Sequence, residues 1–180
     1  MLSKTFSRRD LGLGAAALSL AACTATNTHA DDMLAGEQKD MKMSDTGLTN
    51  EQWASLTEAD WKARLTDMEF NVLRKEGTER PGTSPLNNEK RAGTFVCKGC
   101  ALPLFKSDTK YESGTGWPSF FQPIDGAIDT KIDRKLFVAR TEYHCSRCGG
   151  HQGHVFKDGP RPTGLRYCNN GIALDFIPDV

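Results

Sequence analysis

The sequence predicts a mainly β domain with helices at its N-terminal end and a zinc site built from four cysteines. Beyond Lys90, short apolar runs alternate with Gly, Pro and Asp clusters, a pattern typical of β-rich proteins. Two Cys-x-x-Cys pairs lie in the same region. The apolar runs that we expect to form strands are Thr94–Cys97, Leu102–Phe105, Lys135–Thr141, Gly164–Cys168 and Ile172–Phe176.

The segment before these runs carries signals for helices. Gln52 follows Thr49 at the spacing of a capping box, and a second helix start lies at Thr57. Apolar residues then recur at helical spacing, which predicts one amphipathic helix that runs to about Arg74. These apolar residues are Trp61, Leu65, Met68 and Val72. The Gly- and Pro-rich segment 77–88 is expected to be a loop.

The composition is typical of a single soluble domain. The chain has 180 residues, of which 38% are hydrophobic and 26% are charged, so it is long enough to bury a core without disulfides. Its 23 basic and 23 acidic residues give a formal net charge of zero. Proteins that bind nucleic acids normally carry a basic excess, so we expect no nucleic-acid partner.

The first residues resemble an export signal. Lys4, Arg8 and Arg9 precede an uncharged stretch from Leu11 to Ala22. That stretch is shorter than the roughly 20 residues of a membrane-spanning helix, but it matches the apolar part of a signal peptide. The two adjacent arginines resemble the twin-arginine export signal. A buried core helix is the alternative for this segment.

Two cleavage sites compete at the end of the export signal, residues 1–22. Leu20–Cys23 resembles a lipobox, in which Cys23 would be lipidated and become the new N-terminus; cleavage after Ala30 is the alternative. The polar segment 23–47 is expected to be a flexible tether to a folded domain at 48–180. We therefore expect an exported, periplasmic protein whose only contact with a membrane would be a lipid anchor.

Four cysteines favour a structural zinc site. Cys97 pairs with Cys100, and Cys145 pairs with Cys148, each with two residues between them. Two such pairs complete the tetrahedral sulfur shell of one structural Zn²⁺ per chain, which leaves no open position for chemistry. Two disulfides are the alternative in an exported protein. A thioredoxin-like redox motif is disfavoured because no βαβ context surrounds either pair.

Cys168 is the cysteine that remains for chemistry. If the surrounding residues form a strand, Arg166, Cys168 and Asn170 lie on one face, and the guanidinium favours the nucleophilic thiolate. His151 and His154 lie upstream, and either imidazole could stabilise the thiolate or deliver a proton. The alternatives are a buried, unreactive cysteine, and histidines that bind a metal or pack in the core.

Taken together, these motifs resemble those of the B-type methionine sulfoxide reductases, which are specific for the R epimer. The resemblance covers roughly residues 57–176. The matching stretches are the two cysteine pairs, Gly77–Pro81, Tyr111–Phe120, His151–Phe156, Asp158–Pro160 and Pro162–Cys168.

The resemblance implies a catalytic domain at 48–180 with two antiparallel sheets, arranged like a sandwich or barrel, N-terminal helices and a zinc knuckle. It implies that Cys168 attacks the sulfoxide sulfur and becomes a sulfenic acid, while His151 or His154 protonates the oxygen. The expected substrates are oxidised proteins that carry methionine-R-sulfoxide, so the protein would repair other exported proteins.

The resemblance also assigns residues around the nucleophile. Arg166 and Asn170 match the residues that flank it, and Trp117 matches the aromatic that contacts the substrate's methyl group. Plain core burial is the alternative for Trp117. A zinc-binding module without activity and a thiol–disulfide oxidoreductase are the alternative functions.

Two positions depart from the family pattern. Thr115 stands where many members have a resolving cysteine, so we expect an external thiol, either a thioredoxin-like protein or a small thiol, to reduce Cys168 directly. Gly171 stands where the family commonly has serine, which removes a hydroxyl close to the substrate. We expect the protein to act as a monomer.

Overall fold

The structure is a computed structural model that describes residues 47–134 and 139–180. The expected export signal, Cys23, the cleavage site after Ala30 and all but the last residue of the tether lie outside the described residues. So does most of the expected strand at Lys135–Thr141. Among the helices described, none has both the length and the apolar character needed to cross a membrane.

Three short helices precede the sheets, and a threonine caps the start of each. They are α1 (Asn50–Ser55), α2 (Glu58–Arg64) and α3 (Asp67–Lys75). Each has a complete capping box, in which the threonine hydroxyl and a side chain three residues later satisfy backbone N–H groups at the helix start.

The prediction of one continuous helix from Thr57 to about Arg74 is wrong. Leu65 has an extended backbone and ends α2, and Thr66 caps the start of α3 through a hydrogen bond with the backbone N–H of Glu69. Thr66 and Glu69 form a third capping box, which the regular apolar spacing concealed. Met68, expected on the buried face, is 52% exposed.

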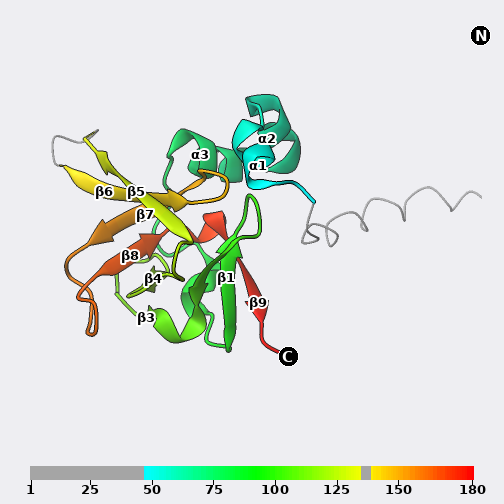
Figure 1. The fold of residues 1–180 in the computed structure, drawn as a ribbon. Coiled ribbons are helices and arrows are strands. Elements are labelled where there is room, and N and C mark those ends of the chain that lie inside the picture. The colour runs from blue at the N-terminus through cyan, green and yellow to red at the C-terminus, as the bar shows by residue number, and fades with distance from the viewer. Residues whose placement is uncertain (1–46, 135–138) are drawn as a thin grey trace, which may run out of the picture. The chain divides into compact units, whose positions relative to one another are not determined.

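Two antiparallel sheets follow the helices, as predicted, but they do not close into a barrel (Figure 1). The three-stranded sheet has the order β2-β1-β9, and the six-stranded sheet has the order β3-β4-β8-β7-β6-β5. The strands are β1 (Gly93–Cys97), β2 (Pro103–Lys106), β3 (Lys110–Tyr111), β4 (Ser119–Phe120), β5 (Ile128–Asp133), β6 (Arg140–Cys145), β7 (His151–Phe156), β8 (Arg166–Asn169) and β9 (Leu174–Pro178).

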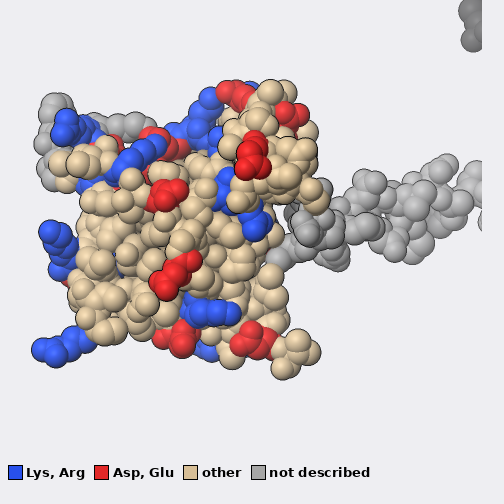
Figure 2. Space-filling model, viewed as in Figure 1, with Lys and Arg blue, Asp and Glu red and all other residues tan. Residues whose placement is uncertain are grey.

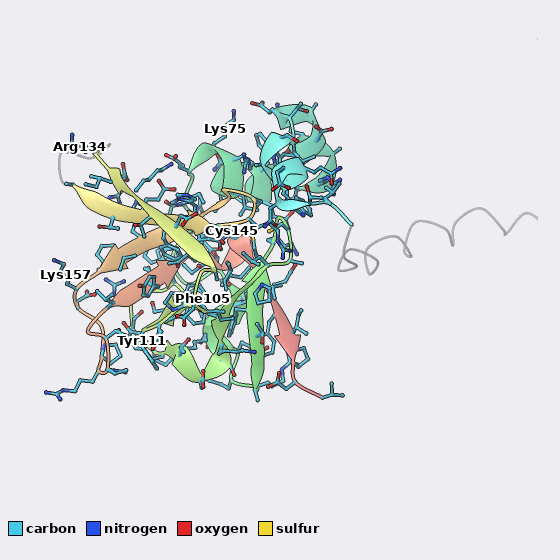
Figure 3. All side chains as sticks on the ribbon, in the orientation of Figure 1. Lys75, Phe105, Tyr111, Arg134, Cys145 and Lys157 are labelled. Carbon is cyan, nitrogen blue, oxygen red and sulfur yellow. The ribbon has the colours of Figure 1, made fainter. Side chains whose placement is uncertain are left out.

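Aromatic side chains from both sheets form the core. Phe105 of β2, which is labelled in Figure 3, stacks on Phe120 of β4, with ring centroids 4.1 Å apart. Phe95 of β1 meets Phe120 edge-on at 4.9 Å, and Phe105 meets Tyr143 of β6 at 6.1 Å. All four side chains have no exposed surface. Burial of each stabilises the fold by about 1.5–3 kcal/mol, so this cluster holds the two sheets together.

The apolar runs predict β1, β2, β8 and β9, but no run predicts β3, β4, β5 or β7. The expected strand Lys135–Thr141 overlaps β6 only at Arg140 and Thr141. The segment 77–88, expected to be a loop, is mostly irregular and contains one short 3₁₀ helix, η1 (Pro85–Asn88). Two further 3₁₀ helices are η2 (Ser107–Thr109) and η3 (Gly171–Ala173), and η3 begins one residue after the end of β8. On the face drawn in Figure 2, acidic and basic side chains are interspersed.

Candidate active site

The four paired cysteines form one buried cluster. Their sulfur atoms lie within 4.8 Å of one another. The Sγ atoms of Cys97 and Cys148 are 3.7 Å apart, and those of Cys100 and Cys145 are 3.5 Å apart. A tetrahedral zinc site with bonds of about 2.3 Å would place its sulfurs about 3.8 Å apart, so the cluster fits Zn²⁺.

This cluster contains no disulfide, since all five cysteines that the structure describes are free. Hydrogen bonding among the sulfurs, together with burial, raises the pKa of Cys97 and Cys148 well above the ordinary thiol value. Four thiolates this close together need a cation to ionise. Because all four side chains are at most 5% exposed, an exchanging thiol cannot easily reach them. The closed geometry supports a structural metal rather than dithiol chemistry.

Gln152 links the cysteine cluster to the end of strand β8. Its amide Nε2 donates to Cys97 Sγ at 3.5 Å, and its backbone carbonyl accepts hydrogen bonds from Asn170. The side chain has no exposed surface. Gln152 therefore connects the four-cysteine cluster to the segment that follows Cys168.

Cys168 lies in the middle of the six-stranded sheet, directly opposite His154. The two residues are register partners on β8 and β7, so their side chains lie on the same face of the sheet. Gly153 makes this approach close, because a Cβ at that position would lie 1.9 Å from the backbone oxygen of Cys168. Both Cys168 and His154 line one cleft of about 200 Å³.

A β-bulge brings His151 beside His154. Residues three apart on a regular strand point to opposite faces. Here β6 advances by one residue, from Tyr143 to His144, while β7 shifts by two, from Gly153 to His151. The rings of His151 and His154 consequently lie 5.5 Å apart.

A buried carboxylate holds each of these two rings. His154 Nε2 is 3.0 Å from Asp133 Oδ2, and Asp133 also pairs with Arg140 at 2.6 Å. His151 Nδ1 is 2.8 Å from Glu142 Oε1, and neither side chain is more than 3% exposed. Burial lowers the pKa of His151 below its usual value, although Glu142 opposes the shift. His151 is therefore disposed to stay neutral near pH 7.

Arg166 lies beside Cys168, as the two-residue spacing predicts. Its guanidinium makes two hydrogen bonds of 2.9 Å to Asp158 and lies 4.3 Å from the centre of the Phe156 ring. Burial raises the pKa of the Cys168 thiol, while the charge of Arg166 and hydrogen bonds from Thr115 and Arg166 act to lower it. The expectation that Arg166 favours the thiolate therefore has the right sign, but burial outweighs it.

Glu79 ties together the residues around the cleft. Its carboxylate accepts hydrogen bonds from the backbone N–H groups of Gly171 and Ile172. Its own N–H donates to Asn170 Oδ1 at 3.1 Å, and its carbonyl accepts from Trp117 Nε1 at 3.2 Å. Burial raises the pKa of this carboxyl group, and the two backbone donors oppose that effect. Glu79 thus fixes Asn170 and Trp117 relative to each other.

The cleft gathers four of the six residues assigned to catalysis and substrate binding: Cys168, His154, Asn170 and Trp117. Arg166 and His151 do not line the cleft. Arg166 is a neighbour of Cys168, and His151 is a neighbour of His154. The alternative of plain core burial does not describe Trp117, which is only half-buried.

Several polar residues of the site have no signal in the sequence pattern. They are Glu79, Asp133, Glu142 and Gln152. Their partners lie far away in the sequence, and isolated acidic residues normally face solvent. The stretch that contains Glu79 resembles the family motif, which was the only available signal.

The fold and the cleft define a class of structure, a β scaffold whose cleft is lined by a cysteine and a histidine and which carries a separate cluster of four cysteines. A family model described as the SelR domain matches residues 65–178. Peptide methionine sulfoxide reductase MsrB of Leptospira interrogans is 54% identical over 121 residues, which cover 67% of this chain and 92% of that protein.

Similar proteins also occur in distant organisms. The peptide methionine sulfoxide reductase MsrB of Agrobacterium fabrum is 50% identical over 123 residues, or 68% of this chain and 91% of that protein. The protein of the same name from Methanosarcina mazei is 50% identical over 124 residues, or 68% of this chain and 89% of that protein. The chain therefore belongs to the MsrB family of peptide methionine sulfoxide reductases.

Proposed function

We propose that this protein reduces methionine-R-sulfoxide in oxidised proteins to methionine, with Cys168 as the nucleophile. The observation that carries this proposal is the pairing of Cys168 with His154 across two strands, in a cleft lined by Trp117. A thiol and an imidazole on the same face can act on the sulfur and the oxygen of one sulfoxide.

The first half-reaction transfers one oxygen atom. The Cys168 thiolate attacks the sulfoxide sulfur, and the oxygen takes up one proton. The oxygen then bonds to the Cys168 sulfur while its bond to the substrate sulfur and the transient S–S bond both break. Methionine leaves, and Cys168 carries the oxygen as a sulfenic acid. The cysteine is oxidised by two electrons and the substrate is reduced by two, so no further reactant is needed in this step.

His154 is the residue that we assign as the proton donor. Asp133 accepts a hydrogen bond from its Nε2, which orients the ring and leaves Nδ1 to exchange a proton with a ligand. His151 is more deeply buried, and burial lowers its pKa. We assign His151, held by Glu142, to positioning its neighbour.

Trp117 supplies the choice of epimer in this proposal. The hydrogen bond from its Nε1 to the Glu79 carbonyl fixes the orientation of the ring. The two sulfoxide epimers exchange the positions of methyl and oxygen. A fixed apolar wall for the methyl group therefore leaves only one epimer with its oxygen toward the proton donor.

An external thiol completes the cycle. Thr115 replaces the resolving cysteine, and the other four described cysteines lie in the buried cluster. One thiol displaces water from the sulfenic acid to form a mixed disulfide, and a second thiol releases Cys168. A thioredoxin-like protein or a small thiol has this chemistry.

The cluster of Cys97, Cys100, Cys145 and Cys148 would hold one Zn²⁺, which supports the fold and takes no part in the reaction. The N-terminal sequence supports export to the periplasm, with lipidation at Cys23 as one outcome of processing. The protein would act there as a monomer. Repair of oxidised exported proteins is the role that follows.

A single-turnover experiment without reductant tests the chemical proposal. We expect one equivalent of methionine per chain, and a gain of one oxygen atom on the peptide that contains Cys168. His154→Gln should slow this step about 100-fold, while His151→Gln should slow it less. Full burst amplitude with oxygen on another residue, or equal effects of the two substitutions, would contradict the assignment.

A further inference from the structure

A groove of about 760 Å³ borders the cleft that contains Cys168. Its lining comes from α3, from the segments 78–86 and 171–176, and from Lys98, and we call it the side groove. Thr78 is exposed and lines both the side groove and the cleft. The two hollows therefore share one wall at the surface of the molecule.

The cleft is too small for more than part of a polypeptide substrate. Pockets that enclose small ligands typically measure about 300–1,000 Å³. The cleft, at about 200 Å³, falls below this range, whereas the side groove falls within it. A methionine sulfoxide in a polypeptide carries main chain on both sides. When its side chain enters the cleft, the residues next to it must lie on the surrounding surface, of which the side groove is the largest hollow part.

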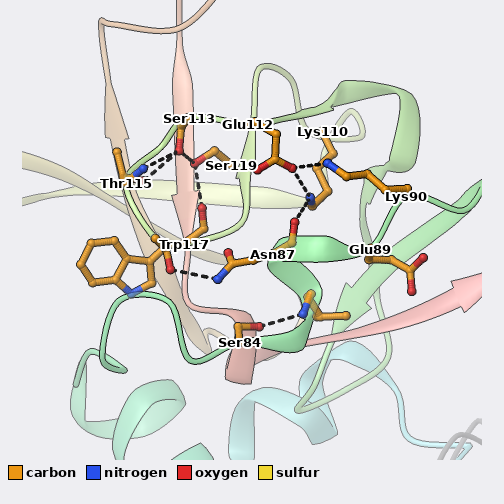
Figure 4. A network of polar contacts seen from close by, with 12 residues as sticks. Ser84, Asn87, Glu89, Lys90, Lys110, Glu112, Ser113, Thr115, Trp117 and Ser119 are labelled. Carbon is orange, nitrogen blue, oxygen red and sulfur yellow. Dashed lines mark hydrogen bonds and ion pairs between the residues drawn. The ribbon is translucent and has the colours of Figure 1, made fainter.

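Hydrogen bonds hold the edge of the side groove and the Trp117 loop together. The Gly82 N–H donates to the Gly116 carbonyl at 2.7 Å, and Asn87 Nδ2 donates to the same oxygen at 3.1 Å (Figure 4). Gly116 directly precedes Trp117, which lines the cleft. Because the side groove and the cleft share this framework, a ligand that spans both does not have to order one relative to the other.

Arg80 gives the side groove a cation without a charged partner. In the described part of the chain, no carboxylate forms an ion pair with its guanidinium. The other charges of the lining are satisfied locally. Lys98 pairs with Asp175 at 2.6 Å and with Glu69 at 3.6 Å, and the Glu79 carboxylate accepts from two backbone N–H groups. The exposed charge of Arg80 is therefore complementary to an acidic side chain of a ligand.

Arg80 lies at the end of the side groove that borders the cleft, because two residues of chain place it at most about 7 Å from Thr78. Other parts of the lining are apolar. Met68 is 52% exposed, and Leu86 and Phe176 are half-buried. An apolar side chain in the side groove would remove the surface of these three residues from water.

We propose that the side groove binds the part of the substrate polypeptide next to the methionine sulfoxide, with an acidic residue against Arg80 and an apolar residue against Met68, Leu86 and Phe176. This inference rests on the proposed function and names the class of peptide that the same site prefers. Two or three residues of extended chain cover the distance from Thr78 to Arg80. The acidic residue would therefore stand two or three positions from the sulfoxide.

A competition assay with the full chain tests the charge preference. Peptides with one central methionine-R-sulfoxide and either Asp or Lys at the second and third positions on both sides are mixed in equal amounts with a dithiol reductant. Mass spectrometry gives their relative rates of reduction. We expect the wild type to favour the Asp peptide about threefold, and Arg80→Glu to favour the Lys peptide. High salt should weaken both preferences. Arg161→Glu, a matched reversal at an exposed residue that lines neither hollow, should keep the wild-type order.

A second pair of peptides tests the apolar part of the side groove. We expect the wild type to favour Leu over Ala at the fourth and fifth positions by about fourfold, the equivalent of one buried CH₂ group. Met68→Leu should keep this preference, and Met68→Asp should remove it. Met68 lies in the first turn of α3, where an acidic residue is favourable, so the fold should tolerate the aspartate.

The outcomes separate this inference from the proposed function. Equal rates for the Asp and Lys peptides, an order that Arg80→Glu leaves unchanged, or a Leu preference that persists in Met68→Asp would overturn the assignment of the side groove. The proposed reduction would then still stand, because the peptides are reduced. Failure to reduce any of the peptides would overturn the proposed function, and the side groove with it.

Discussion

The Ser84 hydroxyl occupies the space that a side chain at position 171 would need. A Cβ built on Gly171 would lie 1.9 Å from Ser84 Oγ and 2.4 Å from Ser84 Cβ. Ser84 is buried, and its Oγ accepts from the N–H of Leu86 at the start of η1. The glycine that departs from the family pattern is therefore required by its neighbour.

This relationship predicts which substitutions are compatible. Gly171→Ser should destabilise the fold by about 1–3 kcal/mol or more through overpacking, measured by denaturant unfolding. Adding Ser84→Gly should recover most of that loss. Adding Ser84→Ala should not, because the Cβ of residue 84 remains in the way. Equal rescue by both would show that only the hydroxyl matters and would contradict the packing account.

A resolving cysteine can be restored at position 115. Because Thr115 stands at the position where many family members have a resolving cysteine, Thr115→Cys should form a disulfide with Cys168 after one turnover on sulfoxide. Dimedone should then trap less sulfenic acid than in the wild type. Thr109→Cys serves as a control that should form none. An intramolecular disulfide at Cys168 in the wild type would contradict the proposed direct reduction by an external thiol.

Removal of the metal should lower the stability of the fold, because the proposed role of the metal is structural. We expect one zinc per chain in the purified protein, measured by elemental analysis. Cys145→Ser should release that zinc and lower Tm by about 10 °C or more. Cys168→Ser, the matched control, should keep both zinc and Tm. A metal-free Cys145→Ser protein with unchanged Tm would contradict a structural role for the cluster.

The two carboxylate oxygens of Glu79 should contribute to both stability and turnover, because each accepts a backbone hydrogen bond beside the cleft. Glu79→Gln keeps the shape but places an amide NH₂ against a backbone N–H, so unfolding free energy should fall by about 1–3 kcal/mol and turnover should fall with it. Glu112→Gln changes an exposed carboxylate that pairs with Lys90, and should have little effect on either measurement. Wild-type stability and turnover in Glu79→Gln would show that this carboxylate does not organise the cleft.

Sequence patterns predict the parts of this molecule that depend on local physics. The period of two residues correctly places Arg166 beside Cys168, and the apolar runs predict four strands. They fail at β7, where Gln152 and His151 are buried through hydrogen bonds rather than as apolar residues. The bulge that brings the two histidines together depends on the register with β6, which no local pattern encodes.

The long-range acidic partners could not be predicted for a related reason. Asp133 and Glu142 face histidines on another strand, and Glu79 reaches Gly171 across 92 positions in the sequence. Each is buried only because its partner is present. The break between α2 and α3 differs, because it has a local signal in the capping box at Thr66. The regular apolar spacing continues across that break and predicts a single helix instead.

The central claim is that Cys168 reduces the R epimer of methionine sulfoxide. The most direct test is turnover of separated R and S epimers in a peptide, with a dithiol reductant, by the wild type and by Cys168→Ser. We predict turnover of the R epimer alone by the wild type, and none by the variant. Equal turnover of both epimers, or activity that survives in Cys168→Ser, would contradict the account.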